Sequence, residues 1–344
     1  MFENKEKTNL NALGEFGLIN HLTSGFENTN AESLIGIGDD AAVIKNNEHT
    51  VISTDQYIEN VHFDVVYTPL KHLGFKVVAA TISDLCAMNA TPKQILISVG
   101  VSSKYTLEAL EDLYNGIKAA CDAYNVDLVG GDTSSSVQGL YISATALGEV
   151  SEQDVVKRTG AQPGELICVT GDLGGAYLGL QILEREKQVF LAAKDMQPDL
   201  ESKDYIIGRQ LKPEARVDIK PLFKELEIKP SSMIDISDGL SSELFHLSKN
   251  SNVGVAIHED KLPIDQQTFD TARELNLDPT TCVLSGGEDY ELLFTLPQKY
   301  YEKIKNSPDI TIIGYVTPIE QGQVLINTEG SSIELKAQGW QHIA

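Results

Sequence analysis

Apolar and polar positions in the first half of the chain recur with two different periods. In TLEALEDLYNGIKAACDAY the large apolar side chains recur at helical spacing, which predicts an amphipathic helix over 106–125. Segment 69–88, which ends at the turn NATP, is also predicted to be a helix. Segments 50–58, 94–102 and 140–149 are rich in Val, Ile, Leu, Thr and Ser and predict strands. Helices that alternate with strands indicate an α/β or α+β domain.

A polar stretch after Glu149, SEQDVVKRTGAQPG, predicts a boundary between domains 1–150 and 151–344. Beyond it, ELICVT, MIDI and VGVAIH predict strands, and GDLGGAYLGLQIL predicts a Gly-rich turn that opens a helix. SDGLSSELFHLSK predicts the helix after MIDI, and TIIGYV predicts a short strand behind GGEDYELLFTL. We expect 185–212 to be a polar, mobile insertion. The second half is therefore also predicted to be α/β.

Length and charge narrow the class of protein. A chain of 344 residues is long for one compact core, so two domains are expected. The formal charge of −23 argues against nonspecific nucleic-acid binding, although acidic proteins hold polyphosphates through Mg²⁺. No apolar run approaches the roughly 20 residues of a membrane helix, and no signal peptide is evident, so we expect a cytoplasmic protein. Four scattered cysteines are expected to be buried, reduced thiols.

The segment STDQYIENVHFD has an unusually polar face for a strand. Residues two apart share a face, so Ser53, Asp55 and Tyr57 point one way while Thr54 and Gln56 point the other. Further acids stand where strands or turns are predicted to end: Asp39, Asp40, Asp84, Asp132, Asp235 and Asp238. Singly each is explained as a turn residue or helix cap. Together they predict carboxylates aimed at one cleft, where hard oxygen ligands hold Mg²⁺ and phosphate.

Glycines beside Asp132 and after the ICVT strand offer backbone N–H groups that could cradle phosphate. They are Gly130 and Gly131 before Asp132, and the glycines of GDLGG, for which the alternative is a tight strand-to-helix turn. Neither a Walker A pattern nor a complete GxGxxG loop occurs, so P-loop and Rossmann sites are excluded.

Seven motifs in order carry a family resemblance: GDDAAVI, STDxxxExVHFD, ISDLCAMNATP, GGDT, KRTGAxPG, DISDGLSSEL and GGEDYELLF. From about Gly36 to Trp340 the chain resembles the bacterial thiamine-monophosphate kinase family, in a superfamily with aminoimidazole ribonucleotide synthetase, selenophosphate synthetase and a hydrogenase maturation protein. The resemblance implies transfer of the γ-phosphoryl group of ATP to thiamine monophosphate. It also implies a homodimer in which two N-terminal sheets form a barrel, with nucleotide near the interface.

The resemblance implies roles at the matching positions. Magnesium ligands would be Asp40, with Asp39 as the neighbouring candidate, and Ser53, Thr54, Asp55, Asp84, Asp132, Asp235 and Asp238. ATP would contact Tyr114, Gly131, Arg158 and Ser237. Thiamine phosphate would contact His62, Glu288 and Trp340. Structural alternatives are a satisfied histidine at His62, a turn cap at Glu288 and a solvated cation at Arg158. No general base is assigned, because a phosphate monoester with a second pKa of about 6 is mostly dianionic at neutral pH.

Other members of the superfamily are the nearest alternatives. Selenophosphate synthetase uses an N-terminal Cys or selenocysteine, and no Cys precedes Cys86 here. The hydrogenase maturation protein needs a C-terminal cysteine, whereas this chain ends WQHIA. The alternative from another class is a non-catalytic sensor of ATP or thiamine phosphates. GGDTSSS also lacks the Arg that often follows this motif in relatives.

Overall fold

The structure is a computed structural model that describes residues 8, 13–37, 42–46, 48–192 and 198–336. The chain divides into two compact units. Met1–Leu85 and Thr91–Glu152 form the N-terminal unit, and Cys86–Ala90 and Gln153–Ala344 form the C-terminal unit. None of the helices in the described part of the chain combines the length and apolar character needed to cross a membrane.

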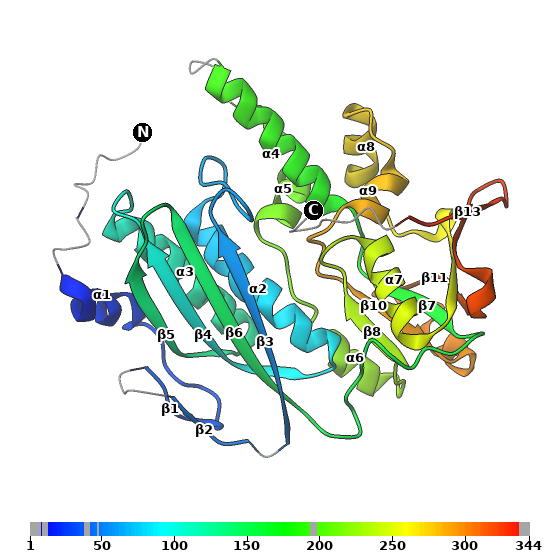
Figure 1. Ribbon diagram of the computed structural model, residues 1–344, viewed down its shortest axis with the longest axis horizontal. Helices are drawn as coiled ribbons and strands as arrows, with labels where there is room; N and C mark the ends of the chain where they lie inside the picture. The colour runs from blue at the N-terminus through cyan, green and yellow to red at the C-terminus, as the bar shows by residue number, and fades with distance from the viewer. Residues whose placement is uncertain (1–7, 9–12, 38–41, 47, 193–197, 337–344) are drawn as a thin grey trace. The chain divides into compact units, whose positions relative to one another are not determined.

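The N-terminal unit is built on a four-stranded sheet with strand order β3-β6-β4-β5 (Figure 1). The strands are β3 (His49–Ile58), β4 (Thr91–Val101), β5 (Asp127–Ser135) and β6 (Leu140–Val150). β6 is antiparallel to both of its neighbours, whereas β4 and β5 are parallel. The smaller elements of this unit are helix α1 (Gly14–Thr23) and the short hairpin of β1 (Ser33–Ile35) and β2 (Val43–Ile44).

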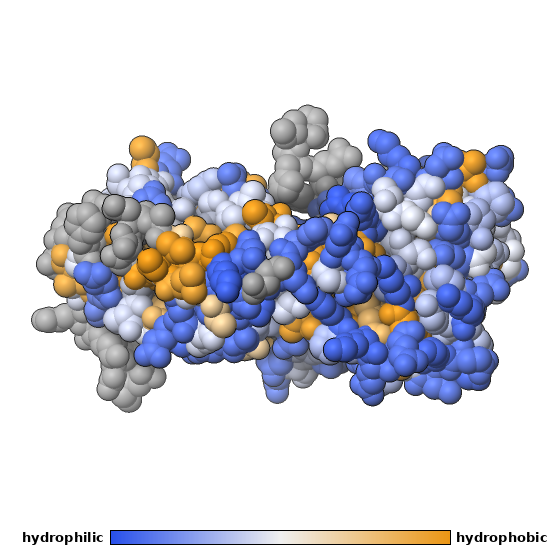
Figure 2. Space-filling view, turned by 90° about the horizontal axis from the view of Figure 1, so that it is seen from below, coloured by the Kyte–Doolittle hydropathy of each residue, from blue (hydrophilic) through white to orange (hydrophobic). Residues whose placement is uncertain are grey.

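Helices α2 (Leu70–Ala87) and α3 (Leu107–Tyr124) lie along one face of this sheet (Figure 1). α3 begins at Thr106, whose hydroxyl accepts a hydrogen bond from the Ala109 N–H, and it ends at Asn125 in a left-handed conformation. The other face is more exposed: Ile52, for example, is 63% exposed. Figure 2 shows apolar side chains gathered on the surface of this unit, whose exposed apolar residues also include Leu34 and Val43.

The C-terminal unit contains a seven-stranded sheet with strand order β13-β12-β9-β11-β7-β10-β8. Among the described strands of this sheet, only β9 and β12 pair in parallel. The strands are β7 (Leu166–Thr170), β8 (Ser232–Asp235), β9 (Gly254–His258), β10 (Leu292–Leu296), β11 (Ile310–Thr317), β12 (Gln323–Ile326) and β13 (Ser332–Glu334). The helices are α4 (Gly175–Ala192), α5 (Asp204–Leu211), α6 (Ile219–Glu225), α7 (Leu240–Ser251), α8 (Gln266–Glu274), α9 (Pro279–Ser285) and α10 (Tyr301–Ile304).

Strand β10, which lies between β7 and β8, separates two apolar cores in this unit. Leu293 belongs to the core that includes Leu240 and Leu244 of α7. Phe294 belongs to the core that includes Phe223 of α6, and the two phenylalanine rings meet nearly edge to face with centroids 5.2 Å apart. A strand buried on both faces explains why LLFTL is apolar at every position except Thr295.

The predicted α/β class and the main elements of both halves are confirmed. All four cysteines are buried and free, as predicted. The prediction of a polar, mobile insertion over 185–212 is wrong for its described residues, because α4 continues to Ala192 and α5 occupies Asp204–Leu211. Ile206 and Leu211 of α5 are buried, so packing against neighbouring elements stabilises a segment whose composition is polar.

Candidate active site

The polar face of β3 lies against helix α2. The Ser53 hydroxyl donates a hydrogen bond to the Asp84 carboxylate, and the Tyr57 hydroxyl donates to Asp55 over 3.4 Å. Burial, together with the neighbouring Asp84 carboxylate, raises the pKa of Asp55 to about 6. The strand and the helix thus hold two carboxylates and a hydroxyl close together.

These oxygen atoms fit a magnesium site. Mg²⁺ prefers oxygen ligands and is usually bound by one or two carboxylates together with water and phosphate. Among the residues that the structure describes, no three His, Cys, Asp or Glu side chains are grouped closely enough to form a metal site by themselves. The Asp55–Asp84 pair therefore fits a cation that takes its remaining ligands from substrate and water.

Thr54 lies on the opposite face of β3 from this pair. Its hydroxyl donates a hydrogen bond to the Ala144 carbonyl over 3.1 Å and lies 3.0 Å from the hydroxyl of Thr145. Thr54 is exposed there. Any contribution from Thr54 to a cation at Asp55 and Asp84 must therefore come from its main chain.

Asp132 is separated from the Asp55–Asp84 pair by the width of the sheet. It lies in β5, beside Ser98 of β4, and β5 and β3 are the two edge strands. Three strand spacings correspond to about 14 Å. One chain therefore does not bring Asp132 to the Asp55–Asp84 pair, contrary to the expectation of a single cleft of acids.

Gly131 is required by strand packing, because a Cβ atom there would lie 1.9 Å from the Ile97 carbonyl oxygen. The ring of Tyr114, on the adjacent helix α3, is buried and packs edge to face on Phe26. Burial raises the pKa of Tyr114 to about 12, with an opposing hydrogen bond from Thr133. Tyr114 and Thr133 connect α3 to β5 next to Asp132.

His62 is held by local contacts at the end of β3. Its Nδ1 accepts a hydrogen bond from the Ile58 N–H over 3.0 Å, and its ring packs edge-on against Tyr57. The loop is anchored by Glu59, whose carboxylate is buried and accepts hydrogen bonds from the Tyr105 hydroxyl and the Leu140 N–H. Glu59, the glutamate of the motif STDxxxExVHFD, is therefore structural, a role that was not predicted from the sequence.

In the C-terminal unit, backbone hydrogen bonds join the DISDG and GGEDY motifs. The Glu288 N–H donates to the Ser237 carbonyl over 2.7 Å, and the Tyr290 N–H donates to the Ile236 carbonyl over 2.9 Å. Gly287 permits this approach, because an added Cβ would lie 2.6 Å from the Ser237 oxygen. The structure therefore brings together four of the predicted site residues of this unit: Asp235, Ser237, Asp238 and Glu288.

Glu243, in the first turn of α7, supports this loop. Its buried carboxylate accepts a hydrogen bond from the Asp238 N–H over 3.1 Å. Burial raises the pKa of Glu243 to about 8, and the nearby carboxylates of Asp238 and Asp235 act in the same direction. The DISDG loop is therefore another place where acids lie close together, which is favourable for a bound cation.

The GDLGG segment forms the tight strand-to-helix turn that was the alternative to a phosphate cradle. Asp289 accepts hydrogen bonds from the Gly174 N–H over 2.8 Å and from the Ala176 N–H over 3.5 Å. The first N–H groups of α4 are thus satisfied by the protein's own carboxylate. This geometry favours the tight turn over a phosphate cradle.

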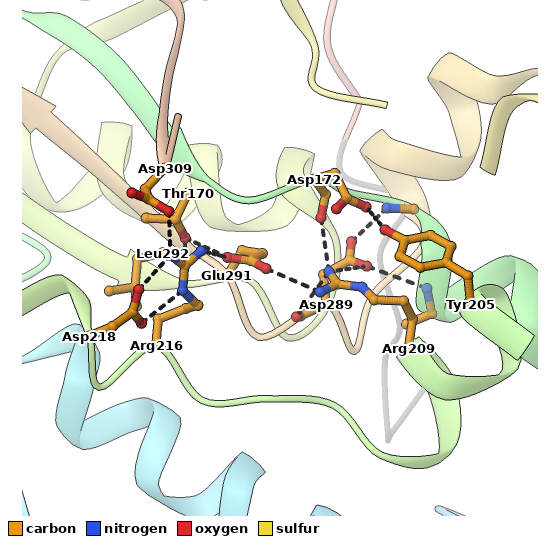
Figure 3. Close-up of polar contacts among 12 residues, drawn as sticks. Thr170, Asp172, Tyr205, Arg209, Arg216, Asp218, Asp289, Glu291, Leu292 and Asp309 are labelled. Carbon is orange, nitrogen blue, oxygen red and sulfur yellow. Dashed lines mark hydrogen bonds and ion pairs between the residues drawn. The ribbon is translucent and has the colours of Figure 1, made fainter. Parts of the chain in front are cut away.

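A buried ionic network surrounds Glu291 (Figure 3). Glu291 accepts hydrogen bonds from Arg209 over 3.1 Å, from Arg216 over 2.6 Å and from the Thr170 hydroxyl over 2.6 Å. Asp289 lies 3.6 Å from Arg209. These partners were not predicted from the sequence. The signal was that the acids of GGEDYELLF stand next to apolar strand residues, because buried acids need buried counterions.

Three predicted site residues lie outside the described residues: Asp39, Asp40 and Trp340. Arg158 is described and exposed, and its carbonyl accepts a hydrogen bond from the Ser251 hydroxyl over 3.4 Å.

Comparison with known proteins identifies the chain. Residues 38–150 match the family model described as AIR synthase related protein, N-terminal domain. The HypE hydrogenase maturation protein in complex with ATP, at 20% identity and a TM-score of 0.71 over 93% of this chain and 94% of that chain, shares the fold. The chain thus combines an N-terminal domain of the AIR synthase-related kind with a fold that HypE shares.

Two proteins with higher sequence identity show which family within this class the chain belongs to. Thiamine-monophosphate kinase of Bacillus subtilis (strain 168) is 32% identical over 337 residues, which cover 96% of this chain and 99% of the relative. The structure of AaThiL complexed with AMPPCP and TMP has 31% identity and a TM-score of 0.74, and covers 98% of this chain and 100% of that chain. The chain therefore belongs to the thiamine-monophosphate kinase family. The resemblance drawn from the motifs is confirmed, and with it the prediction of an enzyme of this kinase class.

Proposed function

We propose that the protein transfers the γ-phosphoryl group of ATP directly to thiamine monophosphate, with several Mg²⁺ ions as cofactors, and produces thiamine diphosphate. The observation that carries the proposal is the Asp55–Asp84 pair, held together by Ser53 and α2, with the pKa of Asp55 raised to about 6. Two neighbouring carboxylates, one on β3 and one on α2, are costly without a cation. The AaThiL complex with AMPPCP and TMP supports the choice of both substrates.

The proposed roles follow the motifs. We assign magnesium binding to Ser53, Thr54 through its main chain, Asp55, Asp84, Asp132, Asp235 and Asp238. We assign ATP contacts to Tyr114, Gly131, Arg158 and Ser237, and thiamine phosphate contacts to His62 and Glu288. Domain 1–150 would supply most of the metal site and the dimer contact, and domain 151–344 the DISDG and GGEDY groups.

The chemistry asks the protein to bring two anions together. Thiamine monophosphate presents a dianionic phosphate at neutral pH and needs no general base to become a nucleophile. When bound, Mg²⁺ supplies charge neutralisation and helps to orient an in-line transfer. The carboxylates of this chain hold that charge in place, and a carboxylate such as Glu288 suits the cationic thiazolium ring of the acceptor.

We also propose that the active form is a homodimer. The acids assigned to the metal site lie at opposite edges of the N-terminal sheet, with Asp55 on β3 and Asp132 on β5. A two-fold pairing of two sheets into a barrel places the β5 edge of one copy beside the β3 edge of the other. The exposed apolar side chain of Ile52, on the face away from α2, supports burial of this face between copies.

The test is formation of thiamine diphosphate by the purified protein with ATP, Mg²⁺ and thiamine monophosphate, beside free thiamine and an EDTA control. We expect metal-dependent product from the monophosphate. A folded protein that binds ATP and forms no product would refute the kinase proposal and favour a sensor.

A further inference from the structure

Helix α5 presents a buried amide to the carboxylate of Glu288. The Gln210 side chain is 5% exposed, and its Nε2 donates a hydrogen bond to Glu288 Oε2 over 2.6 Å. An ionised carboxylate only accepts hydrogen bonds, so the NH₂ end of the amide must face it. This bond connects the 185–212 segment to the GGEDY motif.

The position of α5 is fixed on two sides. On one side, Gly179 of α4 lets the helices approach so closely that an added Cβ would lie 2.3 Å from the Ile206 carbonyl oxygen. On the other side, Arg209, the residue before Gln210, donates to Glu291 over 3.1 Å and to the Asp172 carbonyl over 2.8 Å (Figure 3). Gln210 is therefore presented from a rigid element.

The main chain of Glu288 is equally fixed. Its φ of 60° is uncommon for a residue with a side chain, and its N–H is bonded to Ser237. With the main chain held, the remaining freedom of Glu288 lies in its side-chain torsions, which the bond from Gln210 restrains. A neutral donor also leaves the negative charge of the carboxylate in place, whereas Lys or Arg would neutralise it.

We propose that Gln210 is a positioning residue that orients the Glu288 carboxylate toward the thiamine part of the acceptor and thereby sets the affinity for thiamine monophosphate. The inference rests on the proposed role of Glu288 in substrate binding. It gives the 185–212 segment a role in specificity through its helix α5.

The test compares Gln210→Met, which keeps the length of the side chain and removes the donor, with Gln267→Met on the exposed surface of α8. We expect Gln210→Met to raise the KM for thiamine monophosphate about tenfold, the loss of one hydrogen bond to a charged group, with kcat and the KM for ATP within about twofold of wild type. Gln267→Met should leave all three constants unchanged.

Wild type is assayed first, so that two failures are distinguished. No turnover by the wild type would overturn the proposed function and this inference with it. Wild-type turnover with an unchanged KM in Gln210→Met would overturn the inference alone. A parallel fall in kcat, or a rise in the KM for ATP of the same size, would show a general structural role and also overturn it.

A double-mutant cycle with Glu288→Gln provides a readout that general damage would not reproduce. If Gln210 acts through Glu288, adding Gln210→Met to Glu288→Gln should raise the KM by less than threefold beyond Glu288→Gln alone. Fully multiplicative effects would overturn the inference. A melting temperature for each variant identifies any that fails to fold, and Gln210→Glu, which places a second carboxylate against Glu288, then replaces Gln210→Met with the same expected direction.

Discussion

Asp55 and Asp84 are side chains whose proposed binding role conflicts with stability. Burial and the neighbouring carboxylate raise the pKa of Asp55, which means that its ionised form destabilises the folded chain when no cation is present. The same arrangement favours a divalent cation, because the cation removes the repulsion. Residues selected for metal binding are therefore expected to lower the stability of the metal-free protein.

We expect Asp55→Asn to lower kcat by roughly a hundredfold or more, because an amide is a much weaker ligand for Mg²⁺. In EDTA the same variant should melt at a higher temperature than wild type, since the repulsion with Asp84 is gone. Kinetics at saturating Mg²⁺ and thermal unfolding in EDTA measure the two effects. A near-normal kcat at ordinary Mg²⁺ concentrations would refute the metal assignment of Asp55.

Glu59 shows the opposite electrostatics. Burial works to raise its pKa, but contacts with Lys104, the Tyr105 hydroxyl and the Leu140 N–H outweigh it and lower the pKa below the ordinary value of 4.5. A depressed folded-state pKa contributes stability above pH 4.5, and this contribution is lost as the pH falls further. Glu59→Gln should therefore be less stable than wild type at pH 7, by about 1–2 kcal/mol.

The difference in the free energy of unfolding between wild type and Glu59→Gln should shrink as the pH falls below 4.5. Urea unfolding at a series of pH values measures it, and Glu48→Gln, at an exposed position of the same unit, is the control. A difference that stays constant with pH would contradict the role of the Glu59 charge.

At the scale of elements, the packing of α4 and α5 explains both a wrong prediction and the position of Gln210. The sequence of 185–212 is polar, yet α5 is anchored by buried Ile206 and by Arg209, which pairs with Glu291. Buried partners distant in sequence stabilise such a helix, and its local composition does not reveal them.

Gly179→Ala should destabilise the C-terminal unit by about 1–3 kcal/mol, because its Cβ would lie 2.3 Å from the Ile206 carbonyl oxygen. Gly208→Ala, at a helical position of α5 with no atom within 4 Å of the added Cβ, should be neutral or stabilise by up to about 1 kcal/mol. Chemical denaturation of both variants measures the contrast. Equal effects would show that the close helix contact is not a constraint.

The elements that the sequence predicted well are those whose periodicity is strong. The helix over 106–125 and the strands near 50–58 and 140–149 carry clear patterns and appear as α3, β3 and β6. The site was harder to predict, because motifs give residue types but not strand order. The motifs predicted that Asp55 and Asp132 share one cleft, whereas the strand order places them at opposite edges of the sheet.

At the scale of the whole molecule, the proposed dimer has a consequence for catalysis by mixed pairs. We expect Asp55→Ala and Asp132→Ala each to be inactive alone. A pair formed from one chain of each kind has one site with both acids intact and one with neither. Mixed pairs isolated through two different affinity tags should therefore recover about half of the wild-type activity.

The control combines Asp55→Ala with Asp84→Ala. Both of these residues belong to the same edge of the sheet, through β3 and the contact of Ser53 with Asp84, so every site in the mixed pair lacks one ligand. These pairs should stay inactive. Inactive Asp55→Ala/Asp132→Ala pairs, or activity in the control pairs, would contradict a site shared in this way.

Acids divided between the two edges of one sheet also tie catalysis to the amount of chain present. If each site takes ligands from two copies, dilution below the dissociation constant of the pair removes sites without unfolding any chain. Specific activity would then fall in proportion to concentration. At such concentrations, a cell that halves its synthesis of this chain would lose more than half of its total activity of this enzyme. The expression level itself would then control the rate of product formation.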